Sequence, residues 1–391
     1  MNSWNCIRLG DVCCVNTEAY SEKERWDYVH YLDTGNITKN CIDEIQYIDL
    51  MKEKLPSRAR RKVKYNSILY STVRPNQCHY GIVKEQSSNF LVSTGFSVID
   101  VIDERVDADF LYCYLTMNAV TEKMHAIAEQ STSAYPAIKS SDIEDLELKL
   151  PDILTQKRIA SFLMSLEHKI TNNTKLNKNL EEQAQAIFDE IISFSSTEKC
   201  FLSDIANINP KRQLPKGTVA RCVDMSQLSA TSCCPVGWEF KSFNGGMKFC
   251  NGDTLLARIT PCLENGKKAY INFLQENEIA FGSTEYIVIS PKEAYPAEFF
   301  YCLVNDSAFA DYAVKNLNGS SGRQRVSAKV IGQYRLPKIS TERFSYFSGI
   351  ASSSFTVIRN NFYENIRLAA LRDTLLPRLM SGELDVSNIE L

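Results

Sequence analysis

The sequence predicts an α+β protein, with two tandem α/β domains separated by two long helices that form an antiparallel coiled coil. Three observations lead to this prediction. The first half of the chain recurs in the second half, each half combines short apolar runs with a short helical stretch, and each half ends in Leu-Pro before a long helical pattern. A chain of 391 residues is long enough for two domains with separate cores. We therefore expect an internal duplication with pseudo-two-fold symmetry.

The internal repeat consists of five segments that recur in the same order, with an offset between 186 and 193 residues. A common order and a nearly constant offset indicate a tandem duplication. The matched pairs are IRLGDVCCVNT (7–17) with CFLSDIANINP (200–210), NSILYSTVRP (66–75) with GDTLLARITP (252–261), VSTGFSVI (92–99) with GSTEYIVI (282–289), DFLYCYL (109–115) with EFFYCLV (298–304), and IKSSDIEDLELKLP (138–151) with VSAKVIGQYRLP (326–337). The predicted boundaries are 1–151 and 196–337 for the domains, and 152–195 and 338–391 for the helices.

Within each copy, short runs rich in β-branched and aromatic residues, bordered by turn residues, predict strands. One short helix follows them in each copy, and then come a polar loop and a short strand that ends in Leu-Pro. The strand runs are 67–73, 90–102, 253–259 and 285–289, and the short helices are 108–128 and 296–314.

The two long helices are predicted from apolar residues at steps of three and four, which make a narrow seam. The seam of the first helix contains Ile153, Ile159, Phe162, Leu163, Leu166, Ile170, Leu176, Leu180, Ala184, Ile187, Phe188 and Ile191. The seam of the second helix contains Phe344, Phe347, Ile350, Phe355, Ile358, Phe362, Ile366, Ala369 and Leu375, and we expect this helix to stop at Pro377.

A long narrow seam needs a partner, and the duplication supplies one in the same chain. The alternative is that each helix packs only on its own domain. No Gly or Pro interrupts residues 154–193, so the first helix is a rod of roughly 60 Å at about 1.5 Å per residue. Because such a rod overruns a domain of about 150 residues, the antiparallel pair is favoured.

Composition describes an ordinary globular chain, with 44% hydrophobic and 23% charged residues. No run of apolar residues is long enough to span a membrane, and the N-terminal residues lack the pattern of a signal peptide, so we expect a cytoplasmic protein. Thirteen cysteines without any C-x-x-C motif favour reduced side chains in small apolar gaps over a disulfide framework or a zinc site.

Net charge is −3, which alone argues neither for nor against nucleic acid. The basic residues are nevertheless clustered. KEKLPSRARRKVK at 52–64 carries seven basic residues against one acidic, and 211–221 and 323–335 each carry four basic residues and no acidic ones. Such local patches on a mildly acidic chain are typical of a protein that contacts phosphates at confined places.

The sequence offers little support for an enzyme. Asp152 and the Glu167-His168-Lys169 triplet resemble the PD…ExK pattern of a group of nucleases that bind Mg²⁺. That chemistry needs the carboxylates to converge, whereas here they are separated by roughly 22 Å along one helix. The phosphate-binding, dinucleotide-binding and nucleophile-elbow motifs are absent from the sequence. We therefore expect no catalysis by this chain.

Several motifs resemble the specificity subunits of type I restriction-modification systems. Trp4 followed by Arg8-Leu9-Gly10-Asp11 opens the first copy. The likeness is strongest in Gln156-Lys157-Arg158-Ile159, in the helix from Lys169-Ile170 to Leu180, in Ala184-Gln185-Ala186-Ile187-Phe188, in LRDTLLP (371–377) and in LMSGEL (379–384). The second helix departs at its start, because Glu342-Arg343-Phe344-Ser345 stands where the first has Gln156 to Ile159.

The resemblance implies two target recognition domains, each reading one half of a bipartite, asymmetric site in double-stranded DNA. It also implies that the helices set the spacing and dock two methyltransferase (modification) subunits, to which restriction (nuclease and translocase) subunits add. S-adenosylmethionine, ATP and Mg²⁺ would then belong to the partners, and this chain would hold no cofactor or metal. Two alternatives stay open, namely a specificity subunit of a fused methyltransferase-nuclease (type II-like) system and a coiled-coil scaffold that binds proteins.

Two sets of candidate residues follow. Against each basic residue stands the alternative of a solvated surface charge. The DNA-binding candidates are Arg58, Arg60, Arg61, Lys62, Lys64, Arg74, Tyr135, Lys139, Lys211, Arg212, Arg258, Arg323, Gln324, Arg325 and Lys329. The candidates for partner binding or the coiled coil are Gln156, Arg158, Ile159, Phe162, Leu166, Ile170, Leu180, Phe188, Phe355, Ile358, Phe362, Ile366 and Leu375.

Overall fold

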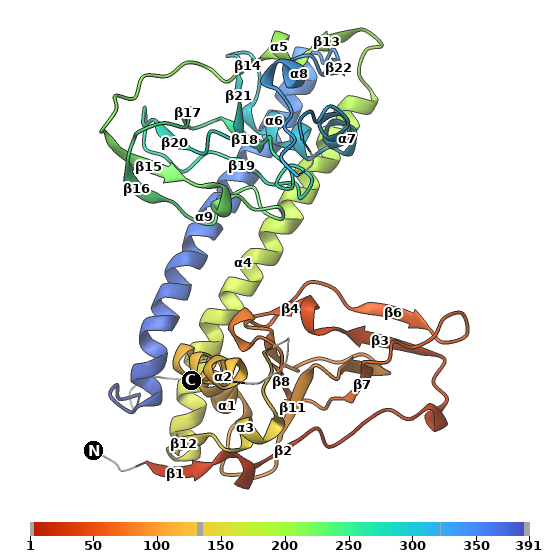
Figure 1. The fold of residues 1–391 in the computed structure, drawn as a ribbon, viewed down its shortest axis with the longest axis vertical. Helices are drawn as coiled ribbons and strands as arrows, with labels where there is room; N and C mark the ends of the chain where they lie inside the picture. Colours follow the sequence, from red (N-terminus) through yellow and green to blue (C-terminus); the bar gives the residue numbers. More distant parts are fainter. Residues whose placement is uncertain (1–3, 131–135, 321, 387–391) are drawn as a thin grey trace. The chain divides into compact units, whose positions relative to one another are not determined.

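The computed structural model describes residues 4–130, 136–320 and 322–386. The chain divides into two compact units. Unit 1 comprises Met1–Thr171 and Arg367–Leu391, and unit 2 comprises Asn172–Ile366. Two long helices, α4 (Ile153–Ser193) and α9 (Thr341–Met380), each contribute one segment to unit 1 and one to unit 2 (Figure 1).

Unit 1 is built around two four-stranded sheets. Its strands are β1 Asn5–Arg8, β2 Cys13–Val15, β3 Tyr28–Leu32, β4 Ile37–Thr38, β5 Cys41–Ile42, β6 Gln46–Asp49, β7 Ala59–Lys62, β8 Ile68–Ser71, β9 Tyr80–Ile82, β10 Phe90–Ser93, β11 Phe96–Val101 and β12 Glu147–Leu150. The sheets have the orders β2-β11-β8-β9 and β6-β3-β10-β7, and β1 pairs with β12. Its helices besides α4 and α9 are η1 Leu9–Asp11, η2 Glu22–Glu24, η3 Thr34–Asn36, η4 Pro75–Gln77, α1 Ala108–Leu115, α2 Asn118–Glu129 and α3 Ser140–Glu144.

Unit 2 is built in the same way. Its strands are β13 Lys199–Phe201, β14 Ala206–Ile208, β15 Val219–Val223, β16 Glu239–Ser242, β17 Met247–Phe249, β18 Thr254–Ala257, β19 Lys268–Tyr270, β20 Ala280–Gly282, β21 Tyr286–Pro291 and β22 Arg335–Pro337. The sheets have the orders β14-β21-β18-β19 and β16-β15-β20-β17, and β13 pairs with β22. Its helices besides α4 and α9 are α5 Leu202–Ile205, η5 Met225–Gln227, α6 Ala297–Asn305, α7 Ser307–Lys315 and α8 Ala328–Gly332.

The strand orders of the two large sheets correspond between the units, whereas the small β4-β5 sheet of unit 1 has no counterpart among the described strands of unit 2. In each unit one sheet contains a single parallel pair, β3 with β10 and β15 with β20, and the other pairs are antiparallel. Asn16 and Asn209, which the repeat aligned, both adopt left-handed backbone conformations with φ of 60° and 52°. Each uses its side-chain oxygen to accept from the neighbouring strand, at 2.9 Å from the Val98 N–H and 2.8 Å from the Val288 N–H. Asparagine suits this position because its short side chain tolerates the left-handed region and bonds the backbone locally.

The core of unit 1 forms where α1 packs on the first segment of α4 and the last turns of α9. Phe110 and Leu111 of α1 are fully buried together with Ile159 and Leu163 of α4. Leu379 of α9 joins the same cluster. Full burial of one such side chain contributes about 2 kcal/mol, so this cluster fixes α4 to the domain that precedes it.

The core of unit 2 is more aromatic. Phe299 of α6 lies 5.0 Å from Phe188 of α4, centroid to centroid, and 5.1 Å from Phe344 of α9. Phe347 and Phe355 of α9 are also fully buried there. Tilted and edge-to-face rings at these distances are favourable arrangements of the aromatic quadrupole.

The single short helix predicted in each copy is wrong, because each unit has two helices there. α1 ends before Met117, whose ψ of 137° leaves the helical region, and α2 begins at Asn118. In unit 2, Asp306 separates α6 from α7, and its carboxylate accepts from the Phe309 N–H at 3.0 Å. Such a cap stabilises a new helix start by about 1 kcal/mol. Apolar periodicity continues across both breaks, so it did not reveal them.

The prediction that the second long helix stops at Pro377 is also wrong, because α9 continues to Met380. A proline removes one intrahelical hydrogen bond, but the residues after it can still be helical. Leu379 and Met380 are buried in the core of unit 1, so packing favours the extra turn. The helix is followed by Gly382, which has a φ of +75° and whose N–H donates to the Leu379 carbonyl at 3.2 Å, so it closes the end of the helix.

In unit 2, the segments of α4 and α9 are joined by asparagines. Asn173 donates to the Glu364 carboxylate at 2.7 Å and to the Asn365 side chain at 2.9 Å. Asn177 accepts from the Asn361 side chain at 2.9 Å. These pairs run in opposite sequence order along the two helices. The predicted seam includes Leu176 and Ile366, but both are exposed, by 46% and 42%, because polar residues occupy the helix contact at this level.

Candidate DNA-binding surfaces

Three backbone segments of unit 1 meet at one end of its sheets, and we call them loop face 1: residues 72–74 after β8, 93–95 between β10 and β11, and 136–139 before α3. The Thr72 N–H donates to the Gly95 carbonyl at 2.8 Å, and the Arg74 N–H donates to the Pro136 carbonyl at 3.0 Å. An isolated antiparallel bridge joins Val73 to Ala137. Backbone hydrogen bonds therefore link the first segment of this face to each of the other two.

Unit 2 has the same arrangement, which we call loop face 2: residues 258–260 after β18, 283–285 between β20 and β21, and 323–326 before α8. The Arg258 N–H donates to the Glu285 carbonyl at 2.9 Å, and the Thr260 N–H donates to the Gln324 carbonyl at 3.0 Å. The isolated bridge here joins Ile259 to Arg325. Loop face 2 thus repeats the backbone pattern of loop face 1 with different side chains.

Three of the predicted DNA-binding residues lie on or beside loop face 1. Arg74 and Lys139 are exposed on it, and Arg58 is exposed beside it, since the Arg58 carbonyl accepts from the Thr94 N–H at 2.8 Å. Arg74 has a φ of 47°, a left-handed conformation that costs energy for a residue other than glycine. Such strain is common at functional positions. The predicted Tyr135 lies outside the described residues.

Three other cations of the basic segment in unit 1 are engaged with acidic side chains. Pairs join Arg60 to Glu22 at 3.6 Å, Lys62 to Glu24 at 2.5 Å, and Lys64 to Glu18 at 2.9 Å. Arg61 is half-buried, burial lowers its pKa, and its guanidinium donates to the Thr94 carbonyl at 3.4 Å. These four cations lie along β7 and its end and have partners within the chain, and Arg61 bonds to Thr94 of loop face 1.

Arg212 in unit 2 points inward. Its guanidinium, 13% exposed, donates to the Asp253 carboxylate at 2.8 Å and to the Ser290 hydroxyl at 3.2 Å. Asp253 is 1% exposed, and burial raises its pKa although Arg212 acts against the shift. This geometry makes Arg212 a structural ion-pair residue, so we leave it out of the proposed DNA-contacting set. The neighbouring Lys211 is exposed.

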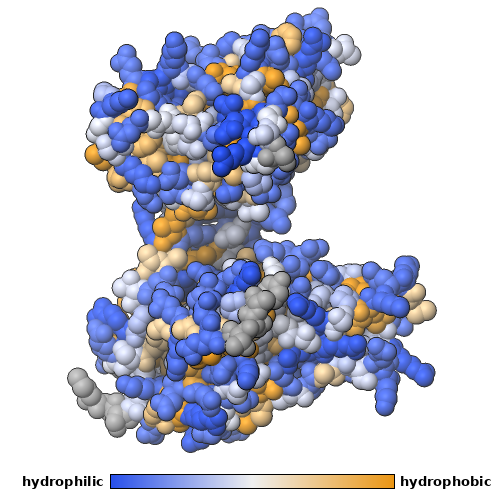
Figure 2. Space-filling model, in the orientation of Figure 1, coloured by the Kyte–Doolittle hydropathy of each residue, from blue (hydrophilic) through white to orange (hydrophobic). Residues whose placement is uncertain are grey.

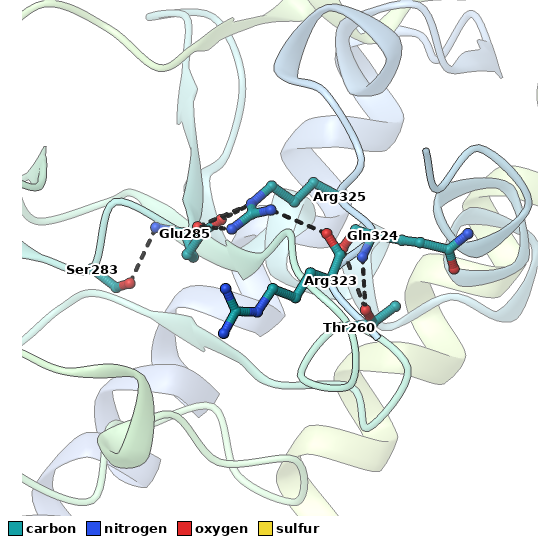
Figure 3. Close-up of polar contacts among 6 residues, drawn as sticks. All are labelled: Thr260, Ser283, Glu285, Arg323, Gln324 and Arg325. Atoms are coloured by element: carbon teal, nitrogen blue, oxygen red, sulfur yellow. Dashed lines mark hydrogen bonds and ion pairs between the residues drawn. The ribbon is translucent and has the colours of Figure 1, made fainter. Parts of the chain in front are cut away.

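On loop face 2, Arg323 is exposed while Gln324 is half-buried. Among the described residues, neither the Arg323 guanidinium nor the Gln324 carboxamide has a hydrogen-bond partner, and Figure 3 shows the two side chains pointing in opposite directions. Arg325 differs, because it forms a two-pronged ion pair with Glu285 at 2.8 to 3.0 Å. Lys329 is exposed on α8.

Arg258 is half-buried beneath loop face 2. Its Nε is buried and has no partner among the described residues, and its charge helps to lower the pKa of Glu285, after the larger effect of Arg325. The backbone pairing aligns Arg258 with Thr72, and Thr260 with Arg74. The two arginines therefore differ by two positions, as their sequence alignment indicated.

Most helix residues predicted to bind partners or to form the coiled coil are in the cores of their own units. Gln156 differs most from this prediction, because it is fully buried. Its Oε1 accepts from the Asp107 N–H at 2.9 Å, and its Nε2 donates to the Arg105 and Pro151 carbonyls at 2.8 Å. These bonds attach α4 to the domain and leave no surface for a partner. The buried apolar members of this set are Ile159, Leu166, Phe188, Phe355 and Ile358. The half-buried members are Arg158, Phe162, Ile170, Leu180, Phe362 and Leu375.

Two largely buried carboxylates on α4 were not predicted from the sequence. The tyrosine of each Phe-x-Tyr-Cys repeat donates to one of them, Tyr112 to Glu167 at 3.2 Å and Tyr301 to Glu181 at 3.0 Å. Burial raises the pKa of both glutamates. Arg372 of α9 lies 3.5 Å from Glu167. The repeated Phe-x-Tyr-Cys motif was a usable signal, because a buried tyrosine hydroxyl needs an acceptor.

The nuclease-like pattern has structural roles instead. Asp152 caps α4, where its carboxylate accepts from the Thr155 N–H at 2.9 Å and from its hydroxyl at 2.7 Å. Glu167 lies on the fourth turn of the same helix and is engaged with Tyr112 and Arg372. The two carboxylates do not converge, so the expectation that the pattern is coincidental is confirmed.

Polar side chains cover most of the visible surface in Figure 2, and the apolar side chains form small groups. Among the described residues, no helix is both long enough and apolar enough to cross a membrane. The exposed cations on the two loop faces are the candidate site that the sequence-predicted residues form in the structure.

Comparison with known proteins agrees with this picture. The family model of the type I restriction modification DNA specificity domain matches residues 1–182. The chain is 24% identical to the type I restriction enzyme HindI specificity subunit of Haemophilus influenzae, over 98% of this chain and 100% of that protein. It is 21% identical to the MjaIX specificity subunit of Methanocaldococcus jannaschii, over 97% and 93%.

Among solved structures, the S subunit of a type I restriction-modification system from M. genitalium has a TM-score of 0.59 and 16% identity over 97% of both chains, which shows a similar fold. The family match, the full-length relatives and this fold agree with one another. Over its whole length the chain is therefore similar to the specificity subunits of type I restriction-modification systems, and its residues 1–182 match their DNA specificity domain.

Proposed function

We propose that this chain reads a bipartite, asymmetric DNA site through loop face 1 and loop face 2, each of which contacts one half-site. Similarity to these specificity subunits supports the role of a DNA-specificity subunit without catalytic activity of its own. One observation carries the two-face proposal. The same backbone arrangement occurs in both units, and each copy presents exposed cations with different side chains around them.

The chemistry of the two faces suits DNA. Exposed arginines and lysines neutralise phosphates and set the position of the protein on the duplex. Arginine also binds guanine O6 and N7 in a two-pronged contact, and glutamine binds adenine N6 and N7. We assign Arg58, Arg74 and Lys139 to phosphate or guanine contacts at one half-site. Arg323 and Gln324 are the residues we assign to base reading at the other.

We further propose that the two domains, 1–151 and 196–337, arose by duplication, and that α4 and α9 form an antiparallel coiled coil that separates them. Helices of about 40 residues are roughly 60 Å long, which exceeds the 34 Å or so of one DNA turn. These helices also dock two methyltransferase subunits. Exposed apolar side chains support a docking role, and they are Leu154, Leu176, Val357, Ile366 and Leu371.

The proposed partners supply the chemistry. Methyltransferase subunits bind S-adenosylmethionine, and restriction subunits that join the complex use ATP and Mg²⁺. This chain selects the DNA sequence on which they act. Its loop faces hold the duplex so that the target adenines reach the bound methyltransferases.

The test is binding of the assembled complex to duplexes in which one half-site at a time is replaced. We expect Arg323→Glu to weaken binding at one half-site by at least about tenfold and to leave the other unchanged. Lys315→Glu reverses an exposed charge on α7 of the same unit and is the matched control. Equal loss at both half-sites would contradict separate readers. Affinity that does not fall with rising salt would contradict DNA recognition and favour a protein-binding scaffold.

A further inference from the structure

The segment before α8 is closed into a tight loop at its base. Asn318 and Arg325 exchange two backbone hydrogen bonds, at 3.1 and 2.9 Å. The Gln324 N–H donates to the Thr260 hydroxyl at 3.1 Å, and its carbonyl accepts from the Thr260 N–H at 3.0 Å. The Val326 N–H donates to the Arg258 carbonyl at 3.0 Å. The backbone that carries Arg323 and Gln324 is thus fastened to the end of β18.

The Arg325 side chain fastens the same loop to a second element. Its Nε donates to both carboxylate oxygens of Glu285 at 3.0 and 2.9 Å, and its Nη2 donates to Oε1 at 2.8 Å. Its Nη1 donates to the Arg323 carbonyl at 3.0 Å. Glu285 is held in turn by the turn before β21, where its N–H donates to the Ser283 hydroxyl at 3.1 Å. Figure 3 shows this chain of contacts, which we call the Glu285–Arg325 clamp.

The clamp leaves Arg325 little capacity for DNA. Three of its donor groups already bond to Glu285 or to the Arg323 carbonyl, and Glu285 neutralises its charge. The Glu285 carboxylate would also repel a phosphate brought close to the pair. A planar guanidinium that forms a two-pronged pair fixes geometry as well as charge. Arg325 is therefore suited to positioning its neighbours.

Loop face 1 lacks this device. The backbone pairing places Ala137 at the position of Arg325 and Gly95 at the position of Glu285. Both partners are replaced together by small residues, while the surrounding backbone bonds are retained. A side chain at Gly95 would also collide with the Thr34 methyl group, which lies 2.8 Å from where a Cβ would stand. The clamp is thus a property of one reader.

We propose that the Glu285–Arg325 clamp is a specificity-positioning device of loop face 2, which holds the backbone that presents the side chains of Arg323 and Gln324 to the bases of one half-site. The inference rests on the proposed DNA-reading function. Arg325, which the sequence predicted to contact DNA, is on this proposal a positioning residue. In loop face 1 the backbone bonds are supplemented by neutral side-chain bonds, such as that from the Thr72 hydroxyl to the Gly95 carbonyl at 2.9 Å.

The experiment uses the complex assembled with its methyltransferase subunits, and Arg323→Ala first identifies the half-site read by unit 2. Glu285→Gln keeps the size of the side chain and removes its charge. We expect it to lower discrimination between correct and substituted bases in that half-site by about tenfold, with discrimination at the other half-site unchanged. Glu198→Gln removes an exposed pair with Lys338, 2.8 Å long in the same unit, and is the matched control, expected to change neither.

Two further variants separate positioning from direct contact. Arg325→Ala and the Glu285→Gln/Arg325→Ala double variant should lose as much discrimination as Glu285→Gln, because each breaks the same pair. For these variants, the slope of the logarithm of DNA affinity against the logarithm of salt concentration should equal that of the wild type. A slope reduced by about one for Arg325→Ala would mean that Arg325 contacts phosphate, and it would overturn the clamp. Where Arg325→Ala fails to assemble, Glu285→Gln decides. If the Glu285→Gln complex discriminates between bases as well as the wild type does, the clamp is rejected but the proposed function stands. If the wild-type complex itself shows no sequence preference, the proposed function is rejected.

Discussion

Each unit has a serine and an aspartate at two matching positions, one just before a strand and one on its neighbour, but the two residue types are exchanged between the units. In unit 1, the Ser67 hydroxyl before β8 donates to the Asp100 carboxylate on β11 at 2.5 Å. At the matching positions of unit 2, the acid is Asp253 and the serine is Ser290, and Arg212 bonds to both. Strand pairing fixes this correspondence, because Ile68 faces Ile99 as Thr254 faces Ile289.

The backbone is therefore conserved between the units, while the polar side chains attached to it differ. The residue before each strand still closes the same turn, since the Lys64 N–H donates to the Ser67 hydroxyl at 2.8 Å and the Cys250 N–H to the Asp253 carboxylate at 2.8 Å. Only unit 2 adds a buried cation to the pair. A scaffold that tolerates such exchanges can carry two unrelated recognition loops, which suits the reading of an asymmetric site.

The largest expected effect comes from breaking the buried pair of unit 2. Arg212→Ala leaves the Asp253 carboxylate buried without its cation, and we expect the free energy of unfolding to fall by about 3 kcal/mol. Denaturant unfolding, followed together with hydrogen exchange of β18 and β21, measures the loss. Lys64→Ala removes an exposed ion pair of unit 1 and should leave the unfolding midpoint unchanged. Equal destabilisation by the two variants would show that the units do not differ in this respect.

A moderate effect is expected at the asparagines that join α4 and α9 in unit 2. Asn173→Ala removes donors that bond to the Glu364 and Asn365 side chains, and we expect a loss of roughly 1 to 2 kcal/mol. The corresponding control is Lys178→Ala, which alters an exposed residue on the next turn. Thermal unfolding of both variants measures the difference. A more stable Asn173→Ala would mean that the polar contact is retained for alignment of the helices and not for stability.

The smallest effect concerns pH and the two buried glutamates. Burial raises the folded-state pKa of Glu181, so the stability linked to this group is fully present in acid and is lost as pH rises through the folded pKa. Glu181→Gln removes this dependence. Its stability relative to the wild type should therefore improve from pH 5 to pH 8, as measured by the unfolding midpoint. Glu167→Gln should show the same sign, because burial raises the pKa of Glu167 too, in spite of Arg372. A relative stability that worsens with pH would contradict the direction of either shift.

Much of the fold was predictable because it depends on repeated local patterns. The strand runs, the first long helix and the alignment of Asn16 with Asn209 all followed from periodicity and turn residues. The breaks at Met117 and Asp306 did not, because no Gly or Pro marks them and their apolar spacing continues. Tertiary packing of Leu379 also overrode the expected stop at Pro377.

The site was less predictable than the fold. A run of basic residues in the sequence does not show which side chains form ion pairs in the fold. Lys62 and Lys64, which form such pairs, were therefore predicted to bind DNA on the same grounds as Arg58. The partners Glu285 and Arg325 are 40 residues apart, and no local pattern connects them. The sequence repeat aligns Gly95 with Glu285, and the backbone pairing of the two units adds Ala137 as the counterpart of Arg325.

Mapping methylated sites in cells that carry the complete system, with and without this chain, tests the central claim most directly. We predict a motif of two short specific halves separated by a fixed nonspecific gap, which disappears without this chain. Cells with the Arg323→Ala variant should relax one half of that motif and keep the other. A contiguous motif, or a change in both halves together, would contradict a chain that reads DNA through two separate faces.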